Sequence, residues 1–152
     1  MSNSNGDPVP PAPLGVRKRV IVIGGGVTGT LSAFELQRAG HDVRLLEAKD
    51  IGNGSSSRSA ACIRAQFGVP STVKGMIYCV RFYTDWMRIM GGERLHIVQN
   101  GYLFLKGWNA DMEAIQKIVD MQRTAGLREV EVLTPDALAE RFPYIETTGL
   151  KG

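Results

Sequence analysis

The residues best suited to chemistry are three glycines, Gly24, Gly26 and Gly29, which follow an apolar run with the spacing G-x-G-x-x-G. In this pattern the first glycine permits a tight turn, the second lets the backbone approach a pyrophosphate, and the third lets a helix pack against a strand. The helix start offers unpaired N–H groups and partial positive charge to phosphate oxygens. The glycines therefore predict a dinucleotide-binding turn, and the flanking residues must support it.

Glu47 stands about twenty residues after the glycines, at the end of a second apolar run. A carboxylate there accepts hydrogen bonds from ribose hydroxyls and repels a 2′-phosphate, which argues against NADP. Lys49, two residues later, is more typical of a solvated surface charge. NAD and FAD share the same ADP half, so the motif leaves both open.

The elements that must position these residues form a β-α-β unit. Residues 19–23 are, after Arg19, apolar and β-branched, as in a parallel strand covered on both faces. Apolar positions at helical spacing predict a helix over 27–39, and Gly40 provides its left-handed end. Residues 43–47 read as the second strand, so the fold class is α/β with a Rossmann-like parallel sheet.

The segment that follows begins as a loop. Residues 51–59 are rich in glycine and serine, and the serines can cap a short helix over 59–64. Pro70 opens the next element, an amphipathic helix over 73–90 that Gly91-Gly92 ends.

The last third of the sequence alternates strand and helix signals. Asn100-Gly101 lies between two β-prone runs and predicts a β-hairpin. Helical spacing predicts a helix over 111–124, and a short strand is expected over 130–133. Thr134, followed by a proline, is the expected N-cap of a final helix.

Composition excludes several classes. The net charge of +3 comes from scattered Lys and Arg, which gives no basic stripe for nucleic acid. Cys62 and Cys79 have no zinc-site spacing, so we expect no metal and a reducing, cytoplasmic location. The apolar runs are shorter than the ~20 residues of a membrane helix. Residues 1–18 read as a flexible leader without the pattern of a secretion signal.

A family resemblance is carried by "GGGVTGTLSAFELQRAGHDVRLLEAKDIGNGSSSRSAACIRAQFG", and later by "NGYLFL" and "LTPDALAERFPYI". These stretches resemble the N-terminus of the D-amino-acid oxidase superfamily of FAD-dependent oxidoreductases. The most similar branch contains sarcosine oxidase β subunits, glycine oxidase, and sarcosine and dimethylglycine dehydrogenases. The likeness runs from Arg19 to the end of the chain, and it implies FAD as the cofactor.

The resemblance also implies a set of cofactor-binding residues. Glu47 matches the acid that holds the adenosine ribose, residues 57–59 match the stretch beside the pyrophosphate and ribityl chain, and Ala61 and Cys62 match positions near the flavin ring. The alternative for the serines is that they only cap a helix. The full predicted set is Gly24, Gly26, Val27, Thr28, Gly29, Glu47, Ala48, Lys49, Ser57, Arg58, Ser59, Ala61 and Cys62.

Two of the matched positions have competing interpretations. Arg64 matches an arginine that clamps the substrate carboxylate in relatives, and a planar guanidinium suits this bidentate task. A surface or ion-pair role for Arg64 is equally compatible with the sequence. Cys62 is better explained as a small buried apolar residue than as a covalent flavin attachment point.

The resemblance further implies that the chain is one part of a larger enzyme. Residues 19–92 would form the FAD-binding region, and 93–152 would begin a substrate domain with the hairpin. Family members are much longer, so we expect a second polypeptide, either a separate subunit or the remainder of a cleaved precursor, to complete the fold and cover its apolar face.

The implied reaction is the oxidation of an amine or amino acid. A hydride leaves the carbon next to nitrogen for flavin N5, which yields an imine that water hydrolyses. No residue is an obvious general base, which suits a substrate that reacts as the neutral amine. The alternatives are an NAD-dependent dehydrogenase and a nucleotide-binding module without catalysis.

Overall fold

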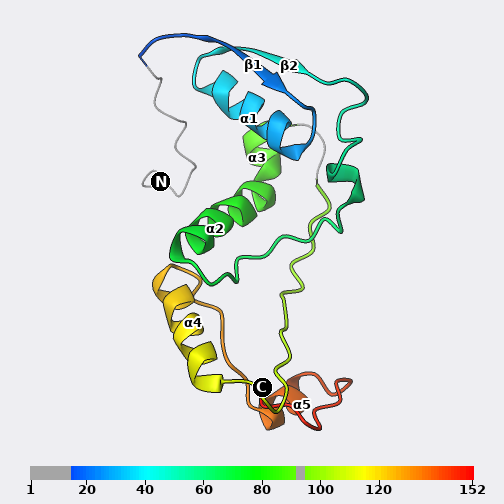
Figure 1. The fold of residues 1–152 in the computed structure, drawn as a ribbon, viewed down its shortest axis with the longest axis vertical. Coiled ribbons are helices and arrows are strands. Elements are labelled where there is room, and N and C mark those ends of the chain that lie inside the picture. The colour runs from blue at the N-terminus through cyan, green and yellow to red at the C-terminus, as the bar shows by residue number, and fades with distance from the viewer. Residues whose placement is uncertain (1–14, 92–94) are drawn as a thin grey trace. The chain divides into compact units, whose positions relative to one another are not determined.

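A computed structural model describes residues 15–91 and 95–152 of the chain (Figure 1). The chain forms two compact units, of which the first ends at Cys62 and the second is Ile63–Gly152. The sequence instead predicts a division by expected function, into a leader, an FAD-binding region and the start of a substrate domain, with boundaries after residues 18 and 92. That functional division stays a prediction. The units are described separately below.

The first unit is the expected β-α-β unit. Strand β1 (Arg19–Ile23) leads into helix α1 (Val27–Arg38), which returns the chain to strand β2 (Asp42–Leu46). The strands pair in parallel, with Arg19 opposite Asp42 and Ile23 opposite Leu46. Helix α1 lies along the strand pair in Figure 1 and contacts both strands. The glycine turn connects the carboxyl end of β1 to the start of this helix.

The sheet faces differ from the prediction for β1, which was expected to be covered on both sides. Burial alternates along both strands, so one face is half-buried and the other is open. On the open face Ile21 is 63% exposed and Ile23 is 86% exposed. The described residues supply helix α1 for one face only, and the prediction of double coverage is wrong for this chain.

The second unit is helical where it has regular structure. Asp111 caps one helix by accepting a hydrogen bond from the Ala114 N–H at 3.0 Å, and Thr134 caps another through the Ala137 N–H at 3.2 Å. Thr134 is therefore confirmed as an N-cap. The helices of this unit are α2 (Pro70–Thr84), α3 (Trp86–Met90), α4 (Met112–Thr124) and α5 (Pro135–Arg141).

A small core holds the second unit together. It contains Val73 from α2, Val119 from α4, and Leu127 and Val130 from the chain that follows α4. Leu138 of α5 is also fully buried. Val73 and Val119 lie at apolar positions of the predicted helical faces, whereas Leu127 and Val130 enter the core from irregular chain.

The helix predicted over 73–90 is interrupted. Asp85 ends α2 and precedes α3, and its carboxylate accepts a hydrogen bond from the Arg88 guanidinium at 2.8 Å. Aspartate competes for backbone and local partners and is a poor residue for a helix interior. Gly91, with φ of +67°, follows the last turn of α3, whereas Gly92 lies outside the described residues.

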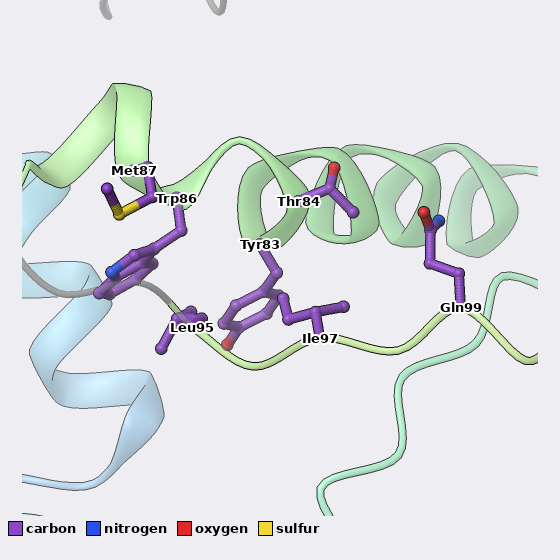
Figure 2. A pocket seen from close by; sticks show the side chains of 7 residues that line it. All are labelled: Tyr83, Thr84, Trp86, Met87, Leu95, Ile97 and Gln99. Carbon is purple, nitrogen blue, oxygen red and sulfur yellow. The ribbon is translucent and has the colours of Figure 1, made fainter.

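The hairpin predicted around Asn100-Gly101 is not formed, because residues 95–105 contain no strand. Gly101 keeps the positive φ of +78° that suits a turn. Figure 2 shows the alternate residues Leu95 and Ile97 directed toward Tyr83 and the end of α2, where they line a hollow of about 170 Å³. An isolated two-stranded hairpin is marginal in water, and here the first run packs on a helix instead.

Two shorter predictions are also wrong. Residues 59–64 are not helical, since only a 3₁₀ turn at Ser56–Arg58 forms and the chain then becomes irregular. Residues 130–133 form no strand, because Val130 enters the core and no neighbouring strand is present among the described residues to pair with them. For residues 130–133 the burial of Val130 shows how tertiary packing overrides local propensity, whereas residues 59–63 are exposed.

None of the helices in the described residues is both long and apolar enough to cross a membrane.

We expect Leu138→Ala to lower the unfolding free energy by about 2–5 kcal/mol, because it leaves a cavity at a side chain with no exposed surface. Urea unfolding followed by the fluorescence of Trp86 and Trp108, both in the second unit, measures this change. Leu103→Ala is the matched control, because Leu103 is 42% exposed, and it should cost about 0.5 kcal/mol or less. Equal losses for the two variants would contradict the assigned core.

Candidate dinucleotide-binding site

The glycine turn is fixed to the end of β2. Gly24 has φ of +104°, and its N–H donates to the Leu46 carbonyl at 2.8 Å. A residue with a side chain rarely adopts this backbone conformation, so glycine is required there. Gly26 then serves as the N-cap of α1 with extended backbone, and Val27 begins the helix.

Gly29 lies where the first turn of α1 comes closest to the glycine loop. A Cβ atom on Gly29 would lie 1.9 Å from the Gly24 carbonyl oxygen and 3.6 Å from a methyl group of Val22. The absence of a side chain therefore lets the first turn of α1 pack directly on the loop and on β1. This matches the third role expected of the glycine pattern.

Glu47 reaches back to the turn. Its carboxylate accepts one hydrogen bond from the Gly25 N–H at 2.6 Å and another from the Lys49 N–H at 2.9 Å. The pKa of this carboxyl is lowered, chiefly by the Gly25 N–H and then by the Lys49 N–H. Two carboxylate oxygens offer about four acceptor positions, so room remains for ribose hydroxyls.

The serine-rich segment is held against the same turn by two further hydrogen bonds. The Gly52 N–H donates to the Gly25 carbonyl at 2.9 Å, and the Val27 N–H donates to the Ser56 hydroxyl oxygen at 2.9 Å. Ser56 is half-buried, whereas Ser55 and Ser57 beside it are exposed. The glycine turn, Glu47 and the serine segment thus lie together in the first unit.

Sequence reasoning missed two residues of this arrangement. Gly25 supplies both an N–H to Glu47 and a carbonyl to Gly52, although only its neighbours belong to the glycine motif. The predicted set includes Ser57, whereas the serine that contacts α1 in the structure is Ser56. The run of three serines signals a polar contact, but only folding shows which hydroxyl faces the helix.

The other predicted residues of the serine segment lie on the surface of the first unit. The Ser57 hydroxyl donates to the Gly54 carbonyl at 3.0 Å, and the Ser59 hydroxyl accepts from the Ala61 N–H at 3.0 Å. Ala61 has φ of +51°, an uncommon conformation for a residue with a side chain. Cys62 is exposed, so its interpretation as a buried apolar residue is wrong for this chain. The remaining predicted residues with exposed positions are Val27, Thr28, Glu47, Ala48, Lys49 and Arg58.

Arg64 belongs to the second unit. Its guanidinium carbon lies 4.9 Å from the ring centre of Phe67 and 5.4 Å from that of Phe104. Its expected partner, a substrate carboxylate, stays a prediction.

The residues around the turn fit an anionic dinucleotide. The N-terminal amides of α1 have no partners within the helix, and no acidic side chain occupies its first turn. Phosphate oxygens can accept from such amides, and Glu47 can accept from a ribose. Among the described residues, no group of three or more His, Cys, Asp or Glu side chains gathers as a metal site would require.

We expect Gly29→Ala to destabilise the first unit by about 1–3 kcal/mol, because the added methyl group overlaps the Gly24 carbonyl. Hydrogen exchange of the amides of β1, α1 and β2 measures the loss of protection. Gly75→Ala is the matched control, since a Cβ there meets no atom within 4 Å and alanine favours the helix. Unchanged exchange in Gly29→Ala would refute the close approach.

The lowered pKa of Glu47 makes the first unit sensitive to acid. An unfolded glutamate titrates near about 4.3, and the folded carboxyl titrates lower. Its stabilising effect is therefore complete above about pH 4.3 and is lost as the pH falls through the folded value. In the native protein the Gly25 amide should lose protection from hydrogen exchange as the pH falls through this range. In Glu47→Gln the protection should already be reduced at neutral pH. The same pH dependence of exchange in both proteins would count against the Glu47–Gly25 bond.

Comparison with known proteins identifies the family. A family model described as FAD dependent oxidoreductase (DAO) matches residues 19–152. The structure is similar to the crystal structure of L-proline dehydrogenase from P. horikoshii, with a TM-score of 0.76 and 27% sequence identity. The matched region covers 89% of this chain and 35% of the dehydrogenase chain.

Two curated relatives are similar over most of the chain. The 4-methylaminobutanoate oxidase (formaldehyde-forming) of Paenarthrobacter nicotinovorans is 28% identical over 141 residues, which are 92% of this chain and 17% of that protein. The aerobic glycerol-3-phosphate dehydrogenase of Staphylococcus aureus is 30% identical over 147 residues, which are 88% of this chain and 25% of that protein. The chain thus spans a quarter or less of the length of these relatives.

The family match decides between the two dinucleotides that the glycine motif leaves open, because proteins of this family depend on FAD. It also confirms the resemblance derived from the residues between Gly24 and Gly68. Since the match covers residues 19–152, this chain belongs to the DAO family of FAD-dependent oxidoreductases.

Proposed function

We propose that this chain is the FAD-binding portion of an enzyme that oxidises an amine or amino acid at the carbon next to nitrogen. The observation that carries the proposal is the bond of Glu47 to the Gly25 N–H, which prepares the glycine turn for the ADP half of FAD. Support for the substrate class comes from the names of two similar proteins, a methylaminobutanoate oxidase and a proline dehydrogenase.

Each part of the first unit has a separate binding role in this proposal. The amides that follow Val27 in the first turn of α1 bind the pyrophosphate, because the Val27 N–H is donated to Ser56, and Glu47 binds the ribose hydroxyls. Ser56 keeps the serine segment beside the start of α1 through the Val27 N–H. These contacts position the cofactor without taking part in the redox step.

When bound, FAD supplies the electron acceptor. The substrate loses a hydride from carbon and a proton from nitrogen, which is a two-electron oxidation to an imine. Water then hydrolyses the imine, and dioxygen or an electron carrier removes the two electrons from the enzyme. Among the described residues we assign no general base for the nitrogen proton, which suits a substrate that reacts as the neutral amine.

Arg64 binds the substrate carboxylate in this proposal. Its guanidinium is half-buried and lies over two aromatic rings, which hold its plane while leaving its N–H groups to donate. Among the described residues no carboxylate forms an ion pair with it. A carboxylate ligand can therefore take up the donors of Arg64.

We also propose that further polypeptide, either a separate subunit or the remainder of a longer precursor, covers the open face of the β1–β2 sheet. Ile21, Ile23 and Leu46 are each more than half exposed on that sheet. Such apolar faces in α/β proteins are normally covered by another layer. The greater length of the relatives supports the same proposal.

Two alternatives remain open to test. The similarity to glycerol-3-phosphate dehydrogenase favours a hydroxyl substrate in place of an amine. A nucleotide-binding module without turnover is compatible with a chain that spans 17% of the oxidase it resembles.

We expect anaerobic addition of L-proline or 4-methylaminobutanoate to bleach the visible flavin absorption of the FAD-loaded protein, purified with any polypeptide that accompanies it. Arg64→Met should raise the substrate concentration needed for bleaching about tenfold or more, because a charge-assisted contact is lost. Gly26→Val, which blocks the pyrophosphate approach, should abolish FAD binding.

Bleaching by glycerol 3-phosphate alone would replace the amine proposal with oxidation of an alcohol. Bound FAD that no substrate reduces, with or without accompanying polypeptide, would favour the non-catalytic module.

A further inference from the structure

One aromatic ring in the second unit is contacted by two cations. The guanidinium carbon of Arg64 lies 5.4 Å from the ring centre of Phe104, and the Nζ atom of Lys106 lies 5.8 Å from the same centre. Both distances are within the range of cation–π contact. Two positive charges from separate segments are therefore gathered at Phe104.

The Lys106 cation is placed by a regular row of side chains. Residues two apart in an extended segment face the same side, which puts Phe104 and Lys106 on one face. Tyr102 continues that row, and its ring stacks on Phe104 with centres 6.4 Å apart. The row directs Lys106 toward the ring that Arg64 also contacts.

The backbone under each cation is held by distant segments of the second unit. The Lys106 N–H donates to the Gly152 carbonyl at 2.7 Å, and the Lys106 carbonyl accepts from the Lys151 N–H at 2.8 Å. On the other side, Phe67 packs against the core, and its carbonyl accepts from the Gln122 side-chain amide at 2.9 Å. These hydrogen bonds fix the backbone of Lys106 and of the segment that follows Arg64.

The charges at this place are not balanced within the described chain. Both cationic residues are half-buried, and no carboxylate of residues 15–91 or 95–152 forms an ion pair with either. An anionic group at either cation can therefore make a charge-assisted contact with a donor that no described carboxylate pairs. A ligand with two acidic groups can meet both cations of the same ring.

We propose that Arg64 and Lys106 form a two-cation site whose ligand is a small dicarboxylate or an amino acid with a second acidic group. The inference rests on the proposed function for the assignment of Arg64 to a substrate carboxylate, and it adds Lys106 as the residue that selects the second acidic group. Phe104 and Phe67 are positioning residues, because they hold the cations and need not contact the ligand.

The test uses calorimetric titration of the purified chain at fixed ionic strength with two probes, glutarate and butyrate. Wild-type protein should bind glutarate about tenfold more tightly, because the second carboxylate makes its own charge-assisted contact. Lys106→Met keeps the apolar stem over Phe104 but removes the charge, so it should reduce glutarate affinity to that of butyrate. Arg64→Met should weaken both probes.

Lys74→Met is the matched control, because Lys74 is an exposed lysine of α2 in the same unit. It should leave the preference for glutarate unchanged within about twofold, since screening limits distant surface charges. Equal affinities for the two probes in wild-type protein, failure to bind either, or equal weakening of both by Lys106→Met would overturn the site.

The two proposals fail in different measurements. A glutarate preference that depends on Lys106, in a protein whose flavin no amine reduces, would retain the site and reject the proposed function. Flavin reduction by amines, with no effect of Lys106→Met on the affinity for either probe, would retain the proposed function and reject the two-cation site.

Discussion

The bond between the Glu47 carboxylate and the Gly25 N–H is the constraint on which the first unit depends. It joins the end of β2 to the loop after β1, and the same glycine then accepts a hydrogen bond from Gly52. The loop is thereby fixed on both sides before any phosphate is present. In the proposed site, a turn that these bonds already hold lowers the ordering cost of binding, because less backbone freedom is lost on association.

The two units differ in how far the described residues complete them. The second unit has a buried core around Val73 and Leu138, whereas the sheet of the first unit leaves the large side chains of Ile21 and Ile23 exposed. In a family of proteins that are several times longer, an uncovered sheet face is where additional layers pack. This open face is the observation behind our proposal that further polypeptide covers the sheet.

Two of the incorrect predictions share one physical cause, which is that a local turn or cap signal depends on a partner elsewhere in the chain. Asn100-Gly101 has the chemistry of a hairpin turn, but the residues before it pack on the end of α2 instead of pairing. The serines before residue 59 suit a helix cap, but Ser56 instead accepts the N–H of Val27 in another helix. Turn and cap propensities amount to about 1 kcal/mol, and a tertiary contact outweighs them.

The sequence by itself determined the β-α-β unit, the glycine turn and the Thr134 cap, because strand and helix periodicity, capping and close glycine spacing act over a few residues. FAD as the cofactor followed from the resemblance of longer stretches to a family, and not from the glycine motif. Only the tertiary structure decided that Gly25 receives Glu47, which serine reaches α1, and that Arg64 and Lys106 meet at Phe104. The bonds of Glu47 and Ser56 and the contact of Arg64 with Phe104 join residues 22 to 40 positions apart. Their geometry is set by how whole elements pack, which no local pattern encodes.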